Sequence, residues 1–353
     1  MASLAETLDA RTRPGSLYSN ESDGSVRCVA CGLRCLIRPG RRGVCRVRFN
    51  SGGTLMVPAN YVAALQCDPT EKKPFFHLLP GSDALTFGML GCDLHCDYCQ
   101  NWVTSQALRD ESAGVGPVDV TADGLVDAAV DRGARLVVSS YNEPLITAEW
   151  AVEIFRGARE RGLATAFVSN GNATAEALDF IRPWTDAYKI DLKTMRDRSY
   201  RRLGGVLQKV LDTVRMAHER GFWVEIVTLI VPGFNDSEEE LRDAAEFIAS
   251  VSPQIPWHVT AFHADYRMTE PSNTTAAQLV RAAEIGTSAG IRYVYAGNLP
   301  GRVGEWEDTR CPACQRTLIA RRGYTILRDE ATHSGGRCPG CGQSIPGLWS
   351  WPR

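Results

Sequence analysis

The sequence lacks a run of 18 apolar residues, a block of like charges and an excess of basic residues. The first absence argues against a membrane-spanning helix, because such a helix needs about 20 mostly apolar residues. The near-balanced charge, −2 overall with pI ≈ 6.3, argues against a charged tail and against nucleic acid as a partner. Residues 1–25 contain no apolar segment of a signal peptide, and we therefore expect a cytoplasmic protein.

Cysteine is missing over a long stretch, between Cys99 and Cys311, and Cys67 stands alone. In a reducing compartment, grouped cysteines bind metals more often than they form disulfides. We therefore predict three separate metal sites. The three groups are Cys28, Cys31, Cys35 and Cys45, then Cys92, Cys96 and Cys99, then Cys311, Cys314, Cys338 and Cys341.

The middle group lies in the stretch Gly91 to Asn101, which reads GCDLHCDYCQN and has C-x3-C-x2-C spacing. Three thiolates can hold three corners of a [4Fe–4S] cube and leave one iron open to another ligand. Structural zinc takes four protein ligands, so three cysteines argue against it. The alternative is a small zinc or iron knuckle that is completed by a distant fourth ligand.

The N-terminal group has four cysteines, which fits either zinc or an auxiliary iron–sulfur cluster. Two roles remain open for this site: a structural role, in which the metal closes the N-terminal module, and a role in electron transfer. Six arginines crowd the same segment, and they either face solvent or neutralise thiolate charge; the alternative is an anionic partner. They are Arg34, Arg38, Arg41, Arg42, Arg46 and Arg48.

The C-terminal group consists of two C-x2-C pairs separated by 23 residues, Cys311 to Cys314 and Cys338 to Cys341. This spacing is typical of a zinc ribbon or a rubredoxin-like module, with zinc preferred over iron. A segment of this size needs its metal to fold. It forms either a structural cap on the rest of the protein or a docking surface for a partner.

Between residues 85 and 298, apolar runs of four to eight residues alternate with helical periods. This alternation predicts an α/β fold with parallel strands and right-handed crossovers. About six β/α units are too few for a closed eightfold barrel, so we expect an open, TIM-like partial (β/α)6 barrel with small cysteine-rich metal-binding modules at both ends. The expected parts are a flexible lead at 1–25, an N-terminal module with a linker at 26–84, the barrel at 85–300 and the C-terminal module at 301–353.

Polar residues follow the predicted strands at the points where the strands end. In parallel β/α architectures, loops at the carboxyl ends of the strands form the site. Each stretch alone is weak evidence for a functional site, because Ser-Asn-Gly is a common turn and Asp-Leu-Lys fits a solvated strand end. Together they predict one polar rim beside the cysteine loop, made of Ser140–Pro144, Ser169–Gly171, Asp191–Lys193, Pro232–Asn235, His263 and Gly297–Asn298.

The motifs together resemble radical S-adenosylmethionine (SAM) enzymes of the pyruvate formate-lyase activating enzyme-like class. The radical SAM member of the AmmeMemoRadiSam system is similar over about residues 28–349. The matching stretches are the three cysteine groups, Asp68–Pro74, Tyr141–Pro144, Ser169–Gly171, Ile190–Lys193, Trp257–His258 and Tyr293–Asn298. This resemblance implies a partial radical SAM barrel, a [4Fe–4S] cluster and SAM.

The resemblance implies that Cys92, Cys96 and Cys99 hold the cluster, with Tyr98 near the adenine of SAM. Asn142 and Glu143 stand at the family's loop for the SAM amino group, which is usually rich in glycine and is Ser-Tyr-Asn-Glu here. A carboxylate such as Glu143 suits an ammonium group, since charge-assisted hydrogen bonds are strong. The alternative for Glu143, beside Pro144, is a carboxylate that caps a helix.

Five further residues have implied contacts with SAM. Ser169 and Asn170 approach the ribose or the methionine part, and Lys193 meets the carboxylate. Asp191 orders a neighbouring group or cation, and His263 flanks the adenosine. A strand histidine, His258, is expected to be a satisfied core residue instead.

The implied activity is reductive cleavage of SAM to a 5′-deoxyadenosyl radical, which abstracts hydrogen from a substrate. The reductant is an external one-electron carrier of the flavodoxin or ferredoxin type. A small-molecule substrate is favoured, because no ferredoxin-like cysteines follow Cys99, as they often do in glycyl-radical activases. The alternative is an activase that modifies a partner protein, and a remote alternative is a non-catalytic scaffold stabilised by metal.

Overall fold

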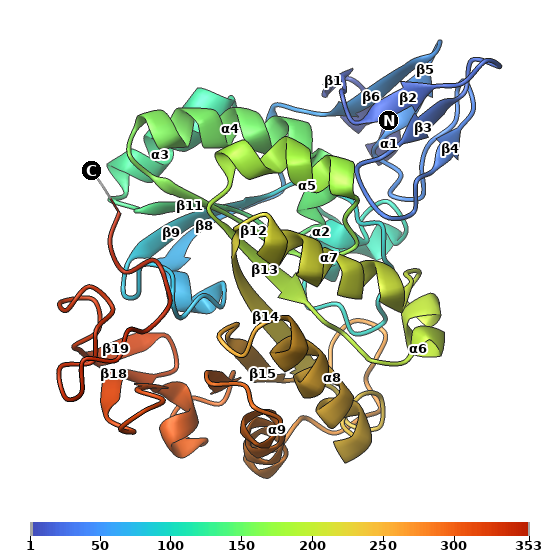
Figure 1. The fold of residues 1–353 in the computed structure, drawn as a ribbon. Coiled ribbons are helices and arrows are strands. Elements are labelled where there is room, and N and C mark those ends of the chain that lie inside the picture. Colours follow the sequence, from blue (N-terminus) through green and yellow to red (C-terminus); the bar gives the residue numbers. More distant parts are fainter. Residues whose placement is uncertain (1–2, 352–353) are drawn as a thin grey trace.

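An eight-stranded sheet forms the centre of the computed structural model, which describes residues 3–351 (Figure 1). Its strands pair in the order β16-β15-β14-β13-β12-β11-β9-β8. All neighbours are parallel except β8, which pairs antiparallel with β9. The bounds are β8 Ala64–Pro69, β9 Asp83–Gly88, β11 Leu136–Ser139, β12 Ala164–Ser169, β13 Ala187–Asp191, β14 Trp223–Ile230, β15 Trp257–Ala261 and β16 Val294–Gly297.

Helices connect the parallel strands and cover the outer face of the sheet (Figure 1). On this face, Trp150 and Phe155 of α4 pack edge-on against Phe87 of β9, and Phe155 also contacts Phe167 of β12. The helices are α3 Ala122–Asp131, α4 Ala148–Glu160, α5 Ala175–Ile181, α6 Asp197–Arg202, α7 Leu207–Glu219, α8 Glu238–Val251 and α9 Ala276–Ser288.

Within residues 3–351, β16 and β8 are the two edges of the sheet and do not pair with each other. The predicted α/β fold with an open, partial barrel is therefore confirmed. Helix α6 was not predicted, since its six residues carry too little apolar periodicity. None of the described helices is long and apolar enough to cross a membrane.

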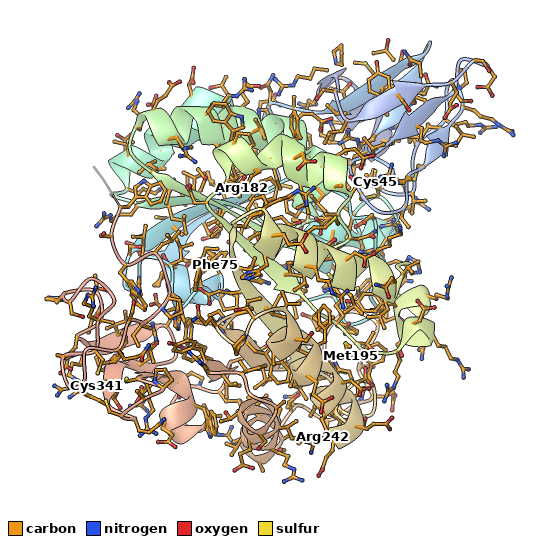
Figure 2. All side chains as sticks on the ribbon, viewed as in Figure 1. Cys45, Phe75, Arg182, Met195, Arg242 and Cys341 are labelled. Carbon is orange, nitrogen blue, oxygen red and sulfur yellow. The ribbon has the colours of Figure 1, made fainter. Side chains whose placement is uncertain are left out.

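The inner face of the sheet is filled by the segment between β8 and β9, which begins with the short 3-10 helix η1 (Thr70–Lys72). Phe75, Leu78 and Leu79 are buried against small side chains of β11 and β12. Phe75 lies near the centre of the molecule (Figure 2). Leu348 forms a bridge with Leu78, so the C-terminal segment completes this filling. We name residues 74–79 and 345–351 the plug.

Two small sheets precede the barrel, with strand orders β1-β6-β5 and β2-β3-β4. Residues 4–20, predicted as part of a flexible lead, are instead ordered. Helix α1 (Leu4–Asp9) has a capping box of Ser3 and Glu6, and Leu8 and Leu17 are buried. The strands are β1 Thr12–Pro14, β2 Tyr18–Asn20, β3 Val26–Cys28, β4 Leu36–Ile37, β5 Phe49–Ser51 and β6 Thr54–Pro58.

A three-stranded sheet follows β16 at the other end, after the 3-10 helix η5 (Gly304–Glu307). Its strands are β17 (Thr309–Arg310), β18 (Thr317–Arg322) and β19 (Thr325–Asp329). We name residues 309–344 the ribbon. The remaining short elements are β7 Tyr61–Val62, β10 Val118–Asp119, α2 Trp102–Ser105, η2 Glu111–Ala113, η3 Pro144–Thr147 and η4 Arg182–Trp184.

Candidate active site

A cavity of about 700 Å³ opens at the carboxyl ends of the parallel strands, and Pro74 of the plug forms part of its wall. Its wall includes loops after β9, β11, β13, β15 and β16 together with Gly323 and Tyr324 of the ribbon. The structure thus brings loops far apart in the sequence to one rim. Among the predicted site residues, the wall contains Cys96, Tyr98, Cys99, Asp191, Lys193 and His263.

The cysteine loop begins at Gly91, whose φ of +95° is rare for residues with a side chain. A Cβ there would lie 2.9 Å from the carbonyl oxygen of Cys45, so the loop packs directly against the N-terminal region. After this turn, the amide of Leu94 donates to the Cys92 sulfur at 3.4 Å, and the Ser105 hydroxyl lies 3.1 Å from the Cys99 sulfur. N–H and O–H groups that point at a sulfur atom stabilise the negative charge of a thiolate, which is the form that binds a metal.

Burial raises the pKa of all three thiols in this loop, and that of Cys96 reaches about 12. Without a metal, these side chains would therefore be neutral thiols at pH 7. A bound cation deprotonates its thiol ligands outright. Three cysteines in one short loop, with Cys96 and Cys99 on the cavity wall, thus fit a [4Fe–4S] cluster.

Asp191 lies between two lysines on the cavity wall. The ammonium group of Lys193 is 3.2 Å from one carboxylate oxygen, and Lys189 forms an ion pair with the other. Although burial opposes ionisation, the two ammonium groups lower the pKa of Asp191 to about 2. Two positive charges share one negative charge, so an anionic group of a ligand is favoured here.

Glu143, by contrast, lies behind the cavity wall, where its carboxyl group meets three donors of the protein. It accepts hydrogen bonds from the Leu145 amide at 3.1 Å, the Ser169 hydroxyl at 2.7 Å and the Asn170 amide at 2.8 Å. It caps η3 just before Pro144, which is the structural alternative that the sequence left open. Burial raises its pKa to about 8, and a contact with the SAM ammonium stays a prediction.

Asn142, Ser169 and Asn170 also lie outside the cavity wall. The Asn142 amide oxygen accepts from the Met89 amide at 3.1 Å, next to the cysteine loop. The Asn170 amide donates to Asp93 at 2.7 Å, and Asn172 donates to the other carboxylate oxygen at 2.8 Å. These side chains hold the loops that carry the site, and direct contact with SAM remains a prediction.

Tyr98 and His263 lie on the cavity wall in different surroundings. Tyr98 is 4% exposed and packs edge-on against Phe234, with ring centroids 5.5 Å apart. His263 is exposed at the edge of the cavity. Both rings border the same cavity. Their predicted contacts with adenosine stay predictions.

Sequence reasoning missed several residues of the cavity wall. Lys189 is two positions before Asp191 on β13, so the alternation of side chains along a strand puts both on one face and offered a signal. Lys72 and Lys73 gave none, because a loop position does not reveal which way its side chain points, whereas Tyr141 lies within the predicted Ser140–Pro144 stretch. Lys73 is buried, and its ammonium lies 3.1 Å from Asp68 and 3.2 Å from the Tyr141 hydroxyl. Tyr324 joins this wall from the ribbon.

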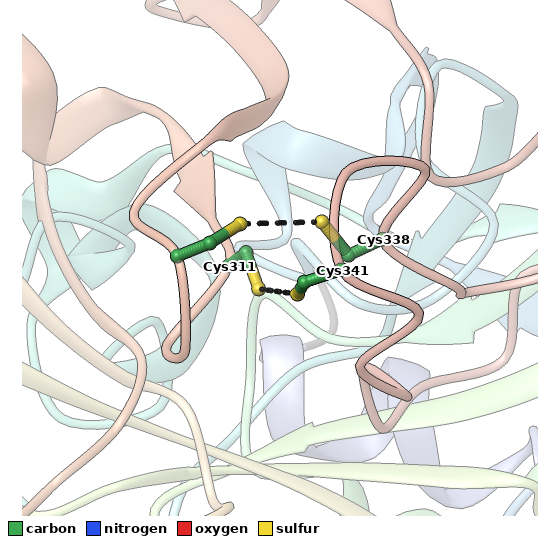
Figure 3. A group of neighbouring side chains, drawn as sticks. Cys311, Cys338 and Cys341 are labelled. Atoms are coloured by element: carbon green, nitrogen blue, oxygen red, sulfur yellow. Dashed lines mark hydrogen bonds between the residues drawn. The ribbon is translucent and has the colours of Figure 1, made fainter.

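The four C-terminal cysteines form a second candidate metal site (Figure 3). Their sulfur atoms all lie within 4.8 Å of one another, with 3.5 Å between Cys311 and Cys341 and 3.6 Å between Cys314 and Cys338. Sulfur atoms about 2.3 Å from a single tetrahedral ion have this mutual spacing. The geometry therefore fits one ion held by four thiolates.

His258 has the core role expected of it. It is 2% exposed, and its Nε2 lies 2.7 Å from a carboxylate oxygen of Glu225. Glu225 also accepts from the backbone amides of Phe76 and His77 in the plug, each at 3.0 Å. His77 in turn lies 2.6 Å from the Tyr295 hydroxyl. This buried network fixes the plug beneath the cavity.

Comparisons with known proteins agree with this geometry. The Radical SAM superfamily model matches residues 87–248, which include the cysteine loop and most of the barrel. An uncharacterized protein of Methanocaldococcus jannaschii is 33% identical over 94% of this chain and 98% of its own length. Pyruvate formate-lyase 1-activating enzyme of Escherichia coli is 26% identical over 52% of this chain and 77% of its own length.

Among solved structures, Streptococcus suis SuiB bound to its precursor peptide SuiA is similar in fold. The TM-score is 0.50 at 15% identity, over 66% of this chain and 52% of SuiB. A likeness at this identity concerns the fold alone. With the three cysteines of its first β/α loop, an open parallel barrel and relatives that include activating enzymes, the chain belongs to the radical SAM superfamily as an enzyme of the pyruvate formate-lyase activating enzyme-like family.

Proposed function

We propose that this enzyme cleaves SAM reductively and abstracts a hydrogen atom from a substrate held in the 700 Å³ cavity. The observation that carries the proposal is the position of Cys96 and Cys99 on the wall of that cavity, which Asp191 and Lys193 also line. With a [4Fe–4S] cluster and SAM bound, the site would supply a 5′-deoxyadenosyl radical. Cys92, Cys96 and Cys99 would hold the cluster.

The residues of the protein bind and orient the reactants. Lys193, with Lys189 beside it, is the natural partner for the SAM carboxylate, because Asp191 neutralises only one of the two ammonium charges. Tyr98 and His263 are the available rings for the adenine. The buried walls limit access of water, which protects a reactive species from side reactions.

The substrate we favour is a small molecule. A cavity of about 700 Å³ is within the usual range of about 300–1,000 Å³ for small-ligand sites. The ribbon narrows the mouth through Gly323 and Tyr324, and Pro300 adds to the same side. Lys72 and Lys73 share the single carboxylate of Asp68, at 3.1 Å each, which favours a substrate with an anionic group.

The second candidate is an activase that takes a segment of a partner protein. It is supported by the activating enzymes among the relatives, which include an indoleacetate decarboxylase activating enzyme that is 24% identical over 56% of this chain. We also propose that the metal of the ribbon is zinc, since four thiolates on two tight turns suit it.

The test is anaerobic reconstitution with iron and sulfide, followed by dithionite and SAM. We expect 5′-deoxyadenosine from the wild type and none from a variant with Cys92, Cys96 and Cys99 replaced by alanine. Cys67→Ala is the matched control, because Cys67 is not on the cavity wall and belongs to no cysteine group. Wild-type protein that holds iron and sulfide but gives no 5′-deoxyadenosine would contradict the proposal.

A further inference from the structure

The N-terminal cysteines lie directly against the loop of the candidate catalytic cluster. Arg109 joins the two regions, since its Nη2 donates to the carbonyl of Val44 and to the carbonyl of Cys92, each at 2.8 Å. Val44 precedes Cys45, and Cys45 also faces Gly91. Cys45 lies where the N-terminal strands meet the barrel (Figure 2). One guanidinium thus touches a neighbour of each cysteine set.

A second connection runs through Asp93, which follows Cys92 and is fully buried. Its carboxylate accepts from the side-chain amide of Asn172 at 2.8 Å. The backbone carbonyl of Asn172 accepts from the amide of Gly32, which follows Cys31, also at 2.8 Å. Hydrogen-bonded contacts therefore link the neighbours of Cys31 to Cys92. The residues along this path are buried, except Gly32 and Cys92, which are partly exposed.

The four N-terminal thiols lack the close mutual spacing of the ribbon thiols, which all lie within 4.8 Å of one another. The Cys35 sulfur and the side chain of Ile37 both lie within 3.7 Å of a Cβ built on Gly43. Among residues 3–351, only the ribbon gathers three or more potential ligands within 4.8 Å of one another. The three cysteines of the catalytic loop share the wider spacing. A cube of iron and sulfide spaces its thiolates further apart than a single ion does.

The outer side of the same region carries exposed apolar side chains among arginines. Leu36, next to Cys35, is 50% exposed, and Val44, next to Cys45, is 49% exposed. Arg38, Arg41 and Arg46 are exposed around them. We name these five residues the N-terminal patch. An apolar centre with a basic rim suits an acidic protein, because opposite potentials steer association.

We propose that Cys28, Cys31, Cys35 and Cys45 bind an iron–sulfur cluster that passes electrons from an acidic one-electron carrier protein, docked on the N-terminal patch, to the catalytic cluster. The inference rests on the proposed function. The carrier loses one electron and the N-terminal cluster gains it. The N-terminal cluster then returns to its oxidised state as the catalytic cluster is reduced by the same electron, and no proton or bond is transferred.

Metal analysis tests the cluster. After anaerobic reconstitution, the variant with Cys92, Cys96 and Cys99 replaced by alanine should keep roughly half of the wild-type iron and sulfide and give an iron–sulfur EPR signal when reduced. Cys28→Ser/Cys31→Ser should lose a similar share of iron, and Cys311→Ser/Cys314→Ser should lose zinc and no iron. Loss of all iron in the triple variant, or loss of zinc in Cys28→Ser/Cys31→Ser, would overturn the proposal.

Rate measurements test the relay. The ratio of 5′-deoxyadenosine formation with reduced flavodoxin to that with dithionite should fall at least about tenfold in Cys28→Ser/Cys31→Ser. Arg41→Glu should lower the same ratio about threefold at low ionic strength, because a rim charge changes association rates. Arg242→Glu, exposed on α8 far from Cys45, is the matched control (Figure 2).

An unchanged ratio in both test variants would overturn the relay, whatever metal is bound. If a variant does not fold, reduced wild-type protein still decides the question, since two clusters give twice the EPR spin count of one. A wild type with two clusters that makes no 5′-deoxyadenosine would contradict the proposed function and leave the cluster assignment in place. The two failures are therefore distinguishable.

Discussion

The two cysteine-rich ends of the molecule are attached to the barrel by similar residues in different ways. At the N-terminal end, Arg48 reaches Glu149 of α4, and at the C-terminal end Arg321 of β18 reaches Glu71 of η1. All four side chains are at most 6% exposed. Each end thus has a buried pair of an arginine and a glutamate at its contact with the barrel.

The geometry of the two pairs differs. Arg48 donates to both oxygens of Glu149, at 2.6 and 2.9 Å, and despite burial this guanidinium lowers the pKa of Glu149. Arg321 lies 3.5 Å from Glu71 and donates instead to Thr309 and to the carbonyl of Phe76. Burial raises the pKa of Glu71. The N-terminal attachment is therefore a compensated charge pair, whereas the ribbon depends on hydrogen bonds, apolar contacts and its metal.

The largest effect should come from removing the metal of the ribbon. Structural zinc sites contribute about 10–16 kcal/mol of binding free energy at pH 7, so Cys311→Ala/Cys314→Ala should leave the ribbon unfolded. Limited proteolysis should then cut within residues 309–344 while the iron content stays at the wild-type value. A ribbon that resists protease without zinc would show that its apolar contacts alone suffice.

The next largest effect should follow from Glu149→Gln. This change leaves the Arg48 charge buried without a carboxylate, which costs about 3–5 kcal/mol. Denaturant unfolding measures the loss of free energy of unfolding. Glu153→Gln is the control, since its pair with Arg13 is partly exposed and is worth about 1 kcal/mol or less. Equal losses in the two variants would refute the contrast between buried and exposed pairs.

A smaller effect should depend on pH through His77 of the plug. Burial lowers its pKa to about 4, from an ordinary value of 6.5. Between these values the unfolded chain binds the proton and the folded protein does not, so stability falls as the pH falls. From pH 7 to pH 5 the expected loss is about 2 kcal/mol. Denaturant unfolding of His77→Asn at both pH values should show less of this dependence, and an unchanged slope would assign it to other groups.

The smallest effect should be that of Glu71→Gln. The raised pKa of Glu71 means that its ionisation opposes folding as the pH rises above its ordinary value, and glutamine has no such cost. We expect a change in unfolding free energy within about 1 kcal/mol at pH 7, because replacing an imperfectly compensated buried charge is often neutral or stabilising. A loss as large as that of Glu149→Gln would mean that the two ends are attached in the same way.

The barrel could be predicted from the sequence because its strands are buried on both faces and read as continuous apolar runs. Leu85 to Leu90 and Trp223 to Val231 are examples. The order of polar loops after these strands then located the cavity. These features depend on residues that are neighbours in the sequence, so the sequence alone reveals them.

The missed features depend on contacts between distant residues. Phe75 and Phe76 stand among charged residues and suggested only an ordered loop, but they fill the barrel because the open sheet leaves apolar surface exposed. Asp93 gave no sign that it would meet Asn172. Glu143 was assigned to SAM by resemblance, and the sequence did not reveal the three protein donors that its carboxyl group meets.

The bridge between Leu78 and Leu348 has a consequence for biosynthesis. Residues 345–351 emerge from the ribosome only after every strand of the barrel has been made, and domains generally fold as units during synthesis. Until these residues dock beside Leu78, the apolar cluster of Phe75, Leu78 and Leu79 lacks part of its cover. The inner face of the sheet would therefore stay open to other molecules until this segment has been synthesised.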